Sequence, residues 1–342
     1  MENRIGTVKQ AFHVEMLKRE LPSLQEGQVL VKIKACCICG SDLHIFKDMH
    51  PSVRLPVTVG HEFTGEIVEV GEHVEKFKIG DRVVVEPAVT CGTCDACRHG
   101  EYGYCENITF TYRVGDGAFA DYFIGHEEKM YHLPQNISYQ EGALVEPLAV
   151  AIHAVKRANV RIGDKVVVIG AGAIGIMVAA ICHKLGAKEV LISDLSQFRL
   201  DMALRLGATK TVNPVEEDII DTVVGMTQGK GVDHVFECVG QEKTFQQAFE
   251  LVRQNGLITD IGIFEKPEIK LDISQLVKKE IRVQGSQGYC WDFEDALQLL
   301  EELPLGELIT HTFKLEELQQ AFDTAIQPEH NAIKVCVTSN YS

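Results

Sequence analysis

The sequence predicts an α/β protein of two domains, one rich in β-strands and one built on a doubly wound parallel sheet. The first observation is the length, because 342 residues correspond to about two domains of ordinary size. The second is that residues 1–150 contain short strand-like runs separated by turn glycines. The third is that strand-like and helix-compatible segments alternate after residue 160, which is typical of a parallel sheet.

The β-rich domain, residues 1–150, is indicated by runs of apolar and β-branched residues with partial alternation. Residues 29–34 read Val-Leu-Val-Lys-Ile-Lys, and residues 65–70 and 82–85 have the same character. Gly71 and Gly80 provide turn signals beside these runs. We therefore expect this part of the chain to fold mainly as strands.

The second domain is indicated by six strand-like runs with helix-compatible segments between them. The runs are residues 165–169, 189–193, 210–213, 234–238, 257–262 and 281–285. Six parallel strands are the number in a complete Rossmann sheet, which binds a dinucleotide. We expect this domain to span residues 151–289, with residues 150–161 carrying the chain between the domains. The C-terminal segment, residues 290–342, contains a helical run at 293–303 and a short strand at 334–338.

Composition and charge limit the classes of partner. Hydrophobic residues make up 45% and charged residues 24%, which is ordinary for a globular protein with a sizeable core. The 49 acidic residues outnumber the 33 basic ones, giving a formal net charge of −16. This charge disfavours nucleic acid and anionic membranes as partners. Residues 1–20 show no targeting signal. Residues 166–182 are uncharged but contain three glycines, so they predict a buried strand, turn and helix rather than a membrane span.

Four of the cysteines have the spacing of a metal site. The total of 11 is odd and argues against a fully disulfide-paired secreted protein. The spacing C-x2-C-x2-C-x7-C is formed by Cys91, Cys94, Cys97 and Cys105. Four such thiolates can enclose one tetrahedral Zn²⁺ in a structural site. An iron–sulfur cluster is the alternative, although the seven-residue gap departs from the ferredoxin pattern. The lobe's acidic charge disfavours a nucleic-acid zinc ribbon. Six other cysteines are expected to be buried small hydrophobes: Cys36, Cys37, Cys182, Cys238, Cys290 and Cys336.

A glycine-rich turn follows the first strand of the second domain. It has the pattern G-x-G-x-x-G and consists of Gly170, Ala171, Gly172, Ala173, Ile174 and Gly175. The strand before it and the apolar helix after it are the context that a dinucleotide-binding turn requires. Asp194 ends the next strand, 24 residues after Gly170, where a carboxylate binds the ribose hydroxyls and repels a 2′-phosphate. We therefore expect NAD rather than NADP; a sheet whose glycines serve packing alone is the alternative.

The remaining metal-type residues lie in two short motifs. Residues 39–44 read Cys-Gly-Ser-Asp-Leu-His, and residues 60–62 read Gly-His-Glu. A catalytic zinc needs three protein ligands and an open position for substrate or water. Cys39 and His61 supply two of these ligands, and either Glu62 or Glu146 can supply the third.

At this point the chain resembles the zinc-dependent medium-chain alcohol and polyol dehydrogenases over essentially its whole length. The resemblance rests on the motifs at 39–44 and 60–62, the four-cysteine lobe at 91–105, E-G-A-L-V-E-P at 141–147, and the glycine-rich turn. It implies a GroES-like catalytic domain, completed by residues 290–342, beside the Rossmann domain. It also implies one catalytic and one structural zinc per chain, a cytoplasmic enzyme, and a homodimer or, preferably, a homotetramer.

The resemblance also implies roles for individual residues. Cys39 and His61 would bind the catalytic zinc, with Glu62 as a direct or exchangeable ligand. Glu146 stands where the sorbitol and threonine dehydrogenase branches have glutamate, and it would bind zinc directly or through water. Ser41 and His44 would pass the alcohol proton to solvent. Two further residues have supporting roles: Asp42 would orient His61, and Arg199 would face the adenosine end of the cofactor.

Substrate choice depends on residues around the predicted pocket. Sorbitol-type enzymes have an Arg-Tyr pair after the sixth strand of the cofactor domain, but here Gly288 precedes Tyr289. Phe110, Tyr112 and Arg113 follow the zinc lobe and are candidates to face the pocket. We expect a secondary alcohol of a polyol, sugar acid or cyclitol to be oxidised. The alternatives are a threonine dehydrogenase or other secondary alcohol dehydrogenase, a zinc-free reductase of activated alkenes or quinones, and a non-catalytic NAD-binding protein.

Overall fold

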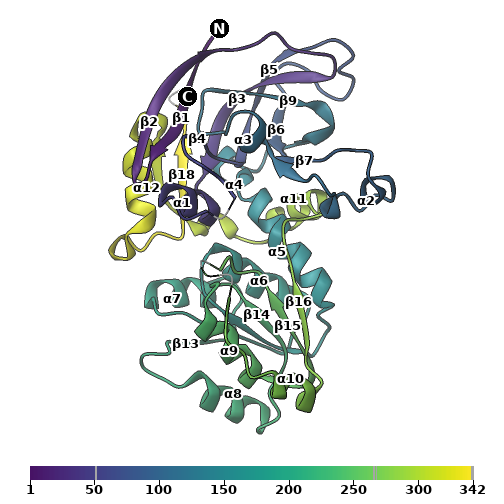
Figure 1. Cartoon of the computed structure of the whole chain (residues 1–342), viewed down its shortest axis with the longest axis vertical. Coiled ribbons are helices and arrows are strands. Elements are labelled where there is room, and N and C mark those ends of the chain that lie inside the picture. The colour runs from purple at the N-terminus through teal and green to yellow at the C-terminus, as the bar shows by residue number, and fades with distance from the viewer. Residues whose placement is uncertain (51, 265, 267, 340–342) are drawn as a thin grey trace. The chain divides into compact units, whose positions relative to one another are not determined.

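The structure is a computed structural model of the chain that describes residues 1–50, 52–264, 266 and 268–339. It contains two compact units (Figure 1). Unit 1 comprises Met1–Glu146 and Phe293–Ser342, and unit 2 comprises Pro147–Asp292. The predicted α/β class and the six-stranded parallel sheet are both confirmed.

Unit 1 is mainly β-structure. Its strands are β1 (Glu2–Gln10), β2 (His13–Glu20), β3 (Gln28–Cys37), β4 (Val57–Thr58), β5 (Glu62–Val70), β6 (Arg82–Val85), β7 (Ala88–Val89), β8 (Thr109–Phe110), β9 (Tyr122–His126), β10 (Met130–His132), β17 (Ile309–Lys314) and β18 (Lys334–Thr338). The largest sheet has the order β10-β6-β5-β3-β18-β17, and β9 also pairs with β3. Smaller sheets are formed by β2-β1-β4 and by β7-β8. The C-terminal strand β18 thus lies directly beside β3 from the start of the chain.

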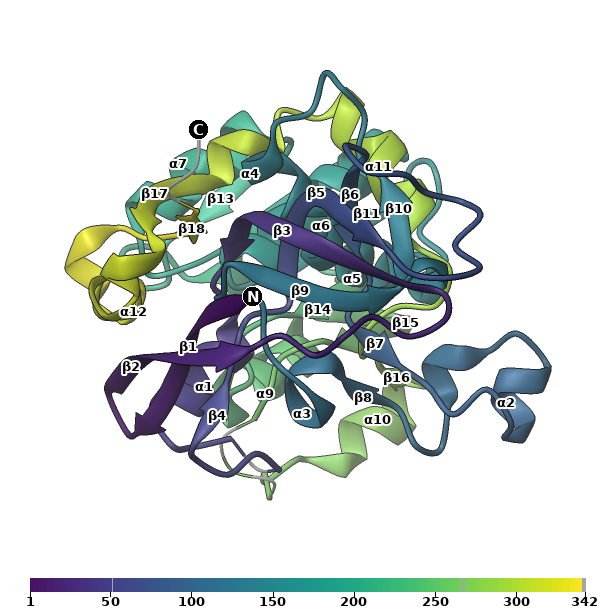
Figure 2. The ribbon, with the colours of Figure 1, turned by 90° about the horizontal axis from the view of Figure 1, so that it is seen from above.

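The helices of unit 1 are short. They are α1 (Gly40–Phe46), α2 (Asp95–Arg98), α3 (Thr111–Val114), α4 (Tyr139–Gly142), α11 (Phe293–Glu302) and α12 (Leu318–Ile326). Helix α4 begins with a capping box, in which Ser138 and Glu141 satisfy each other's backbone N–H groups. Helix α11 buries Phe293, Ala296 and Leu300, the spacing of one helical face. Figure 2 shows the segment around α2 projecting away from the large sheet.

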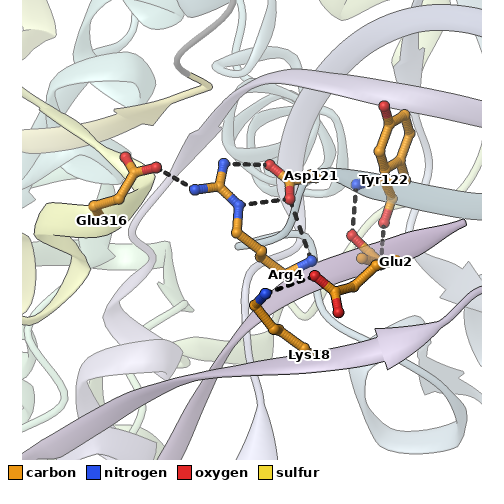
Figure 3. Close-up of polar contacts among 7 residues, drawn as sticks. Glu2, Arg4, Lys18, Asp121, Tyr122 and Glu316 are labelled. Atoms are coloured by element: carbon orange, nitrogen blue, oxygen red, sulfur yellow. Dashed lines mark hydrogen bonds and ion pairs between the residues drawn. The ribbon is translucent and has the colours of Figure 1, made fainter.

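One polar cluster joins three distant parts of unit 1 (Figure 3). Arg4 of β1 donates from Nε and Nη2 to the two carboxylate oxygens of Asp121, at 2.8 and 2.7 Å. Its Nη1 donates to Glu316, which lies just before α12. Asp121 is buried while Arg4 is about a quarter exposed, so the forked pair is partly shielded from water. The cluster fastens β1 to the segment before β9 and to the C-terminal part of the chain.

Unit 2 is built on the parallel sheet. Its strands are β11 (Lys165–Ile169), β12 (Glu189–Ser193), β13 (Lys210–Val212), β14 (Val232–Glu237), β15 (Val252–Asp260) and β16 (Arg282–Gly285). Their order is β13-β12-β11-β14-β15-β16, the order of a doubly wound dinucleotide-binding sheet. The helices are α5 (Val145–Ala158), which begins in unit 1, α6 (Ala173–Lys184), α7 (Gln197–Arg205), α8 (Ile219–Thr227), α9 (Glu242–Leu251) and α10 (Ile273–Lys279). Residues 166–182 form a buried strand, turn and helix, as predicted.

Strand β15 begins five residues earlier than the sequence predicts. Within the added residues, Asn255 adopts a left-handed backbone with φ 54°, which asparagine tolerates better than most residues. The strand nevertheless continues through this position, because Val252 pairs with Val232 before the register shifts. None of the helices in the described ranges has both the length and the apolar character needed to cross a bilayer.

Candidate functional site

The first site in unit 1 brings together residues from two motifs. Cys39 caps the start of α1, and His61 and Glu62 stand at the start of β5. One potential ligand atom from each of these residues lies within 4.8 Å of the others. His61 and Glu62 are buried, whereas Cys39 is partly exposed. A thiolate, an imidazole and a carboxylate gathered in this way are a donor set that zinc accepts.

Asp42 contacts the segments that carry Cys39 and His61. Its buried carboxylate accepts hydrogen bonds from the backbone N–H of Cys39 at 3.0 Å and of Gly60 at 3.3 Å. Nδ1 of His61 lies 3.4 Å from the same carboxylate. Burial lowers the pKa of His61, but the charges of Asp42 and Cys39 raise it by more, to well above its ordinary value. A carboxylate that orients an imidazole in this manner is a common support of metal-binding histidines.

Glu62 has a cationic neighbour that the sequence analysis missed. Nζ of Lys334 donates to both oxygens of the Glu62 carboxylate, and both side chains are buried. Burial lowers the pKa of Lys334, but the charges of Glu62, Cys39 and Cys37, with the hydrogen bond to Glu62, together raise it above its ordinary value. The two residues are separated by 272 positions in the chain, so no local motif indicated the contact.

Two aromatic side chains lie beside the metal-type group. The ring of His61 is 5.8 Å from that of Phe110 and 5.5 Å from that of Tyr112, measured between centroids. Tyr112 is buried, and burial raises the pKa of its phenol. Arg113 follows on the same short helix and donates to the carbonyl oxygen of Ser52 at 3.1 Å. These contacts put an aromatic wall next to His61.

Three other predicted site residues can be placed by element. Ser41 and His44 lie on α1, directly after Cys39, and both are partly exposed. Glu146 is buried in the first turn of α5. Among the described residues, the group within 4.8 Å contains Cys39, His61 and Glu62 but not Glu146.

The four-cysteine lobe forms a second metal-type group. One ligand atom from each of Cys91, Cys94, Cys97 and Cys105 lies within 4.8 Å of the others. The backbone N–H groups of Thr93 and Cys94 lower the pKa of Cys91 to about 5, whereas burial and neighbouring thiols raise that of Cys97 to about 12. All four are free thiols. N–H donors aimed at sulfur stabilise thiolates, so the lobe fits a tetrahedral zinc site.

The glycine-rich turn of unit 2 has the geometry that a dinucleotide requires. Gly170 has a left-handed φ of 102°, and a Cβ on Gly175 would lie 1.9 Å from the carbonyl oxygen of Gly170. A Cβ on Gly172 would meet open space, which leaves room for a ligand at the start of α6. Ala173 and Ile174 form the first turn of that helix. Exposed backbone N–H groups at a helix start bind phosphate.

Asp194 contacts this turn directly. The backbone N–H of Ala171 donates to its Oδ2 at 2.7 Å, and that of Ser196 donates to Oδ1 at 2.9 Å. The carboxylate is therefore fixed at the end of β12, beside the turn. Arg199 lies on the following helix, α7.

The sequence analysis also missed a pair of carboxyl groups at the carboxyl ends of the parallel strands. Glu237 ends β14 and is fully buried, with its carboxylate accepting from the N–H of Gly240 at 2.9 Å and the hydroxyl of Thr244 at 2.7 Å. Asp260 ends β15, and burial together with Glu237 raises its pKa to about 7. Acidic residues at the ends of adjacent strands were the available signal, because ligands bind at this edge of parallel sheets.

The expectation of six buried cysteines is correct for four of them. Cys36, Cys37, Cys182 and Cys336 are buried. Cys238 and Cys290 are partly exposed, so the expectation was wrong for these two. Cys238 follows the end of β14, and Cys290 lies in the loop after β16. Side chains just beyond a sheet have fewer neighbours than those within it.

Comparisons with known proteins agree with this geometry. The family model of the alcohol dehydrogenase GroES-like domain matches residues 25–135, and that described as zinc-binding dehydrogenase matches residues 173–302. The chain belongs to the zinc-dependent medium-chain alcohol and polyol dehydrogenases. It is therefore an oxidoreductase that acts on CH–OH groups, with a GroES-like domain and a Rossmann domain.

Several members of this medium-chain dehydrogenase family are similar to the chain over nearly its whole length. Sorbitol dehydrogenase from Bacillus subtilis is 34% identical, over 94% of this chain and 92% of its own. L-threonine 3-dehydrogenase from Caldanaerobacter subterraneus is 34% identical, over 96% and 97%. An Escherichia coli oxidoreductase of unknown specificity has a solved structure with TM-score 0.94 and 32% identity, covering 100% of both chains.

Two further solved relatives contain cofactors. A zinc-binding dehydrogenase from Sinorhizobium meliloti is bound to NADP, with TM-score 0.92 and 27% identity over 99% of both chains. An alcohol dehydrogenase from Escherichia coli is bound to NADH, with TM-score 0.91 and 26% identity over 98% of this chain and 99% of its own. Relatives of this chain therefore bind nicotinamide dinucleotides of both kinds.

Proposed function

We propose that this dehydrogenase oxidises a secondary alcohol of a polyol, sugar acid or cyclitol to the ketone and transfers the hydride to NAD. The observation that carries the proposal is the group formed by Cys39, His61 and Glu62. It occurs in a chain that also has a dinucleotide turn with open space at Gly172. When bound there, zinc acts as a Lewis acid that polarises the substrate hydroxyl.

The residues around this group hold the metal, carry the proton and exclude water. Cys39 and His61 are the firm ligands, and Asp42 fixes both by accepting from the Cys39 N–H and facing the His61 ring. Ser41 and His44, partly exposed on α1, carry the proton from the substrate hydroxyl to solvent. Glu146 serves as a further ligand, directly or through water. Phe110 and Tyr112 shield the group from bulk water on one side.

The cofactor of this chain is NAD rather than NADP. The proposal rests on Asp194, whose negative charge beside the turn would repel a 2′-phosphate, and on Arg199 standing five positions further on rather than directly after it. Because a relative binds NADP, this preference needs a direct measurement. We expect kcat/KM to be at least tenfold higher with NAD, and Asp194→Ala should reduce the difference.

The four-cysteine lobe holds a structural zinc, so each chain binds two zinc ions. Its four thiols leave no position for a substrate in a tetrahedral site. Metal analysis of the purified protein should give two zinc per chain. One zinc or none would contradict this assignment, and a zinc-free protein would favour a reductase acting on alkenes or quinones.

Assembly and location are also part of the proposal. Strand β16 lies at the edge of the parallel sheet and has exposed residues, including Val283. An exposed edge strand invites pairing with another chain, which supports a homodimer or homotetramer; light scattering of the purified protein measures this. Reduced thiols at both metal sites are best kept in a reducing compartment, and we therefore retain the expectation of a cytoplasmic enzyme.

One experiment tests the main proposal. The purified protein is assayed for NADH production against a panel of polyols, aldonates, cyclitols and threonine, with zinc measured in the same sample. Activity with threonine alone would favour the threonine dehydrogenase alternative, which the similarity to that enzyme keeps open. Cys39→Ser should abolish turnover while NADH still binds. No turnover by the zinc-loaded native chain with any substrate would favour a non-catalytic NAD-binding protein.

A further inference from the structure

Lys334 is a lysine enclosed by the metal-site residues of unit 1. It begins β18 and is 4% exposed. Its Nζ donates to both carboxylate oxygens of Glu62 and, at 3.2 Å, to the carbonyl oxygen of Ile38. An ammonium group has three donors, so these three acceptors satisfy it completely.

The two partners of Lys334 belong to the segments that carry the metal-type residues. Ile38 directly precedes Cys39, and Glu62 directly follows His61. The backbone supports the contact between Lys334 and Ile38. The N–H of Ile38 donates to the carbonyl oxygen of Val335, the residue after Lys334, at 2.9 Å. A single C-terminal residue therefore joins both segments.

Stability alone is a weak reason for this buried pair. Removing two charges from water is costly, and well-packed apolar residues often stabilise a fold as well or better than a buried ion pair. The pair does, however, engage a carboxylate that belongs to the candidate metal site. One of its oxygens lies within 4.8 Å of the ligand atoms of Cys39 and His61, while both oxygens already accept from Lys334.

We propose that Lys334 is a positioning residue that keeps Glu62 off the metal in the resting enzyme. The ammonium engages both carboxylate oxygens, and its positive charge repels a second cation that approaches the same carboxylate. Cys39 and His61 then bind the metal in the resting enzyme, and Glu62 does not. This inference rests on the proposed metal at Cys39 and His61.

Cobalt substitution tests the proposal without measuring activity. Co²⁺ is exchanged into the Cys39–His61 site of the native protein and of Glu62→Gln, Lys334→Met and the double variant. The d–d absorption of Co²⁺ weakens and shifts as its coordination number rises. We expect native protein and Glu62→Gln to give the same band, because Glu62 is not a ligand. Lys334→Met should give a weaker, shifted band as the freed carboxylate joins the metal, and the double variant should restore the native band.

Metal release to a chelator gives a second readout. Lys334→Met should release the ion about tenfold more slowly than the native protein, the factor that one additional ligand contribution of about 1.4 kcal/mol produces. The double variant should return to the native rate. The matched control is Lys279→Met, which removes a half-buried lysine that donates to the Phe249 carbonyl oxygen in unit 2 and should change neither readout.

The outcomes separate the alternatives. A changed band in Glu62→Gln would overturn the proposal, because Glu62 would then be a resting ligand. An unchanged band or faster release in Lys334→Met would overturn it too, as expected of a purely structural lysine. If Lys334→Met does not fold, the Glu62→Gln spectrum still decides. The cobalt-loaded native protein should show a thiolate-to-cobalt charge-transfer band that Cys39→Ser abolishes. If it does not, the proposed function itself fails, and this inference with it.

Discussion

The two carboxyl groups of Glu237 and Asp260, at the ends of β14 and β15, make the stability of unit 2 depend on pH. The pKa of Asp260 rises from 3.8 to about 7 in the folded protein, through burial and the adjacent Glu237. Because its pKa is raised, the carboxyl group of Asp260 carries a proton in the folded protein up to about pH 7. Below about pH 4 both folded and unfolded chains carry this proton. Between pH 4 and 7 only the folded chain does, so stability falls as pH rises through this window.

The size of the effect follows from the shift. About three pKa units at about 1.4 kcal/mol each give an upper limit of about 4 kcal/mol for an isolated buried group. Asp260 keeps partial exposure, and relaxation around the pair reduces the penalty further. We expect about 1–2 kcal/mol, or about 3–6 °C in Tm. Asp260→Asn cannot ionise, and its amide can donate to Glu237, so the variant should lack this loss.

Thermal unfolding of zinc-loaded protein between pH 5 and 8.5 measures the difference. The Tm of Asp260→Asn should approach that of the native protein at pH 5 and exceed it increasingly up to pH 8. The control is Asp221→Asn, an exposed carboxylate on α8, whose offset should not vary in this way. Parallel native and Asp260→Asn curves across the whole range would refute the reasoning.

Three further predictions follow from contacts in the two units. Gly175→Ala should weaken NADH binding by at least tenfold in a fluorescence titration, because its Cβ would lie 1.9 Å from the Gly170 carbonyl oxygen and displace the turn. Cys94→Ser should lower the zinc content from two ions per chain to one, as metal analysis would show, because one of four thiolate ligands is lost. Asp121→Asn should reduce unfolding stability by about 1–3 kcal/mol in chemical denaturation, because its forked pair with Arg4 loses its charge.

Each of these has a control or a contradicting result. Gly225→Ala, a helical glycine with open space around its Cβ position, should leave NADH binding unchanged. Cys182→Ala, at a buried thiol outside the lobe, should keep both zinc ions. Native-like stability of Asp121→Asn would mean that the exposed part of the Arg4 pair is screened by water and contributes little.

The sequence predicted the parallel sheet well because the signals for its strands and turns are local. The central strands are short apolar runs, and the glycine-rich turn at 170–175 directly follows one of them. Strand β15 was misplaced at its start, since the pairing of Val252 with Val232 extends the strand past a register shift and the left-handed Asn255. Tertiary pairing of this kind has no counterpart in the neighbouring residues of the chain.

The candidate metal ligands likewise divide into those predictable from local sequence and those that depend on the tertiary structure. The spacing of Cys91, Cys94, Cys97 and Cys105 predicted their cluster, because four ligands within fifteen residues can close around one ion without help from the rest of the chain. The motifs around Cys39 and His61 indicated two ligands. The partners of Glu62 could not be found, since Lys334 arrives from the opposite end of the chain.

The amino-acid sequence by itself determined the α/β class, the four-cysteine lobe and the dinucleotide turn, since each depends on residues close together in the chain. Only the tertiary structure decided how Asp42 supports Cys39 and His61, which cation pairs with Glu62, and that Glu237 and Asp260 lie opposite each other at the ends of β14 and β15. These contacts depend on strand pairing across long separations, such as β3 with β18. Local sequence patterns carry the propensity of a segment but not the identity of its distant neighbours.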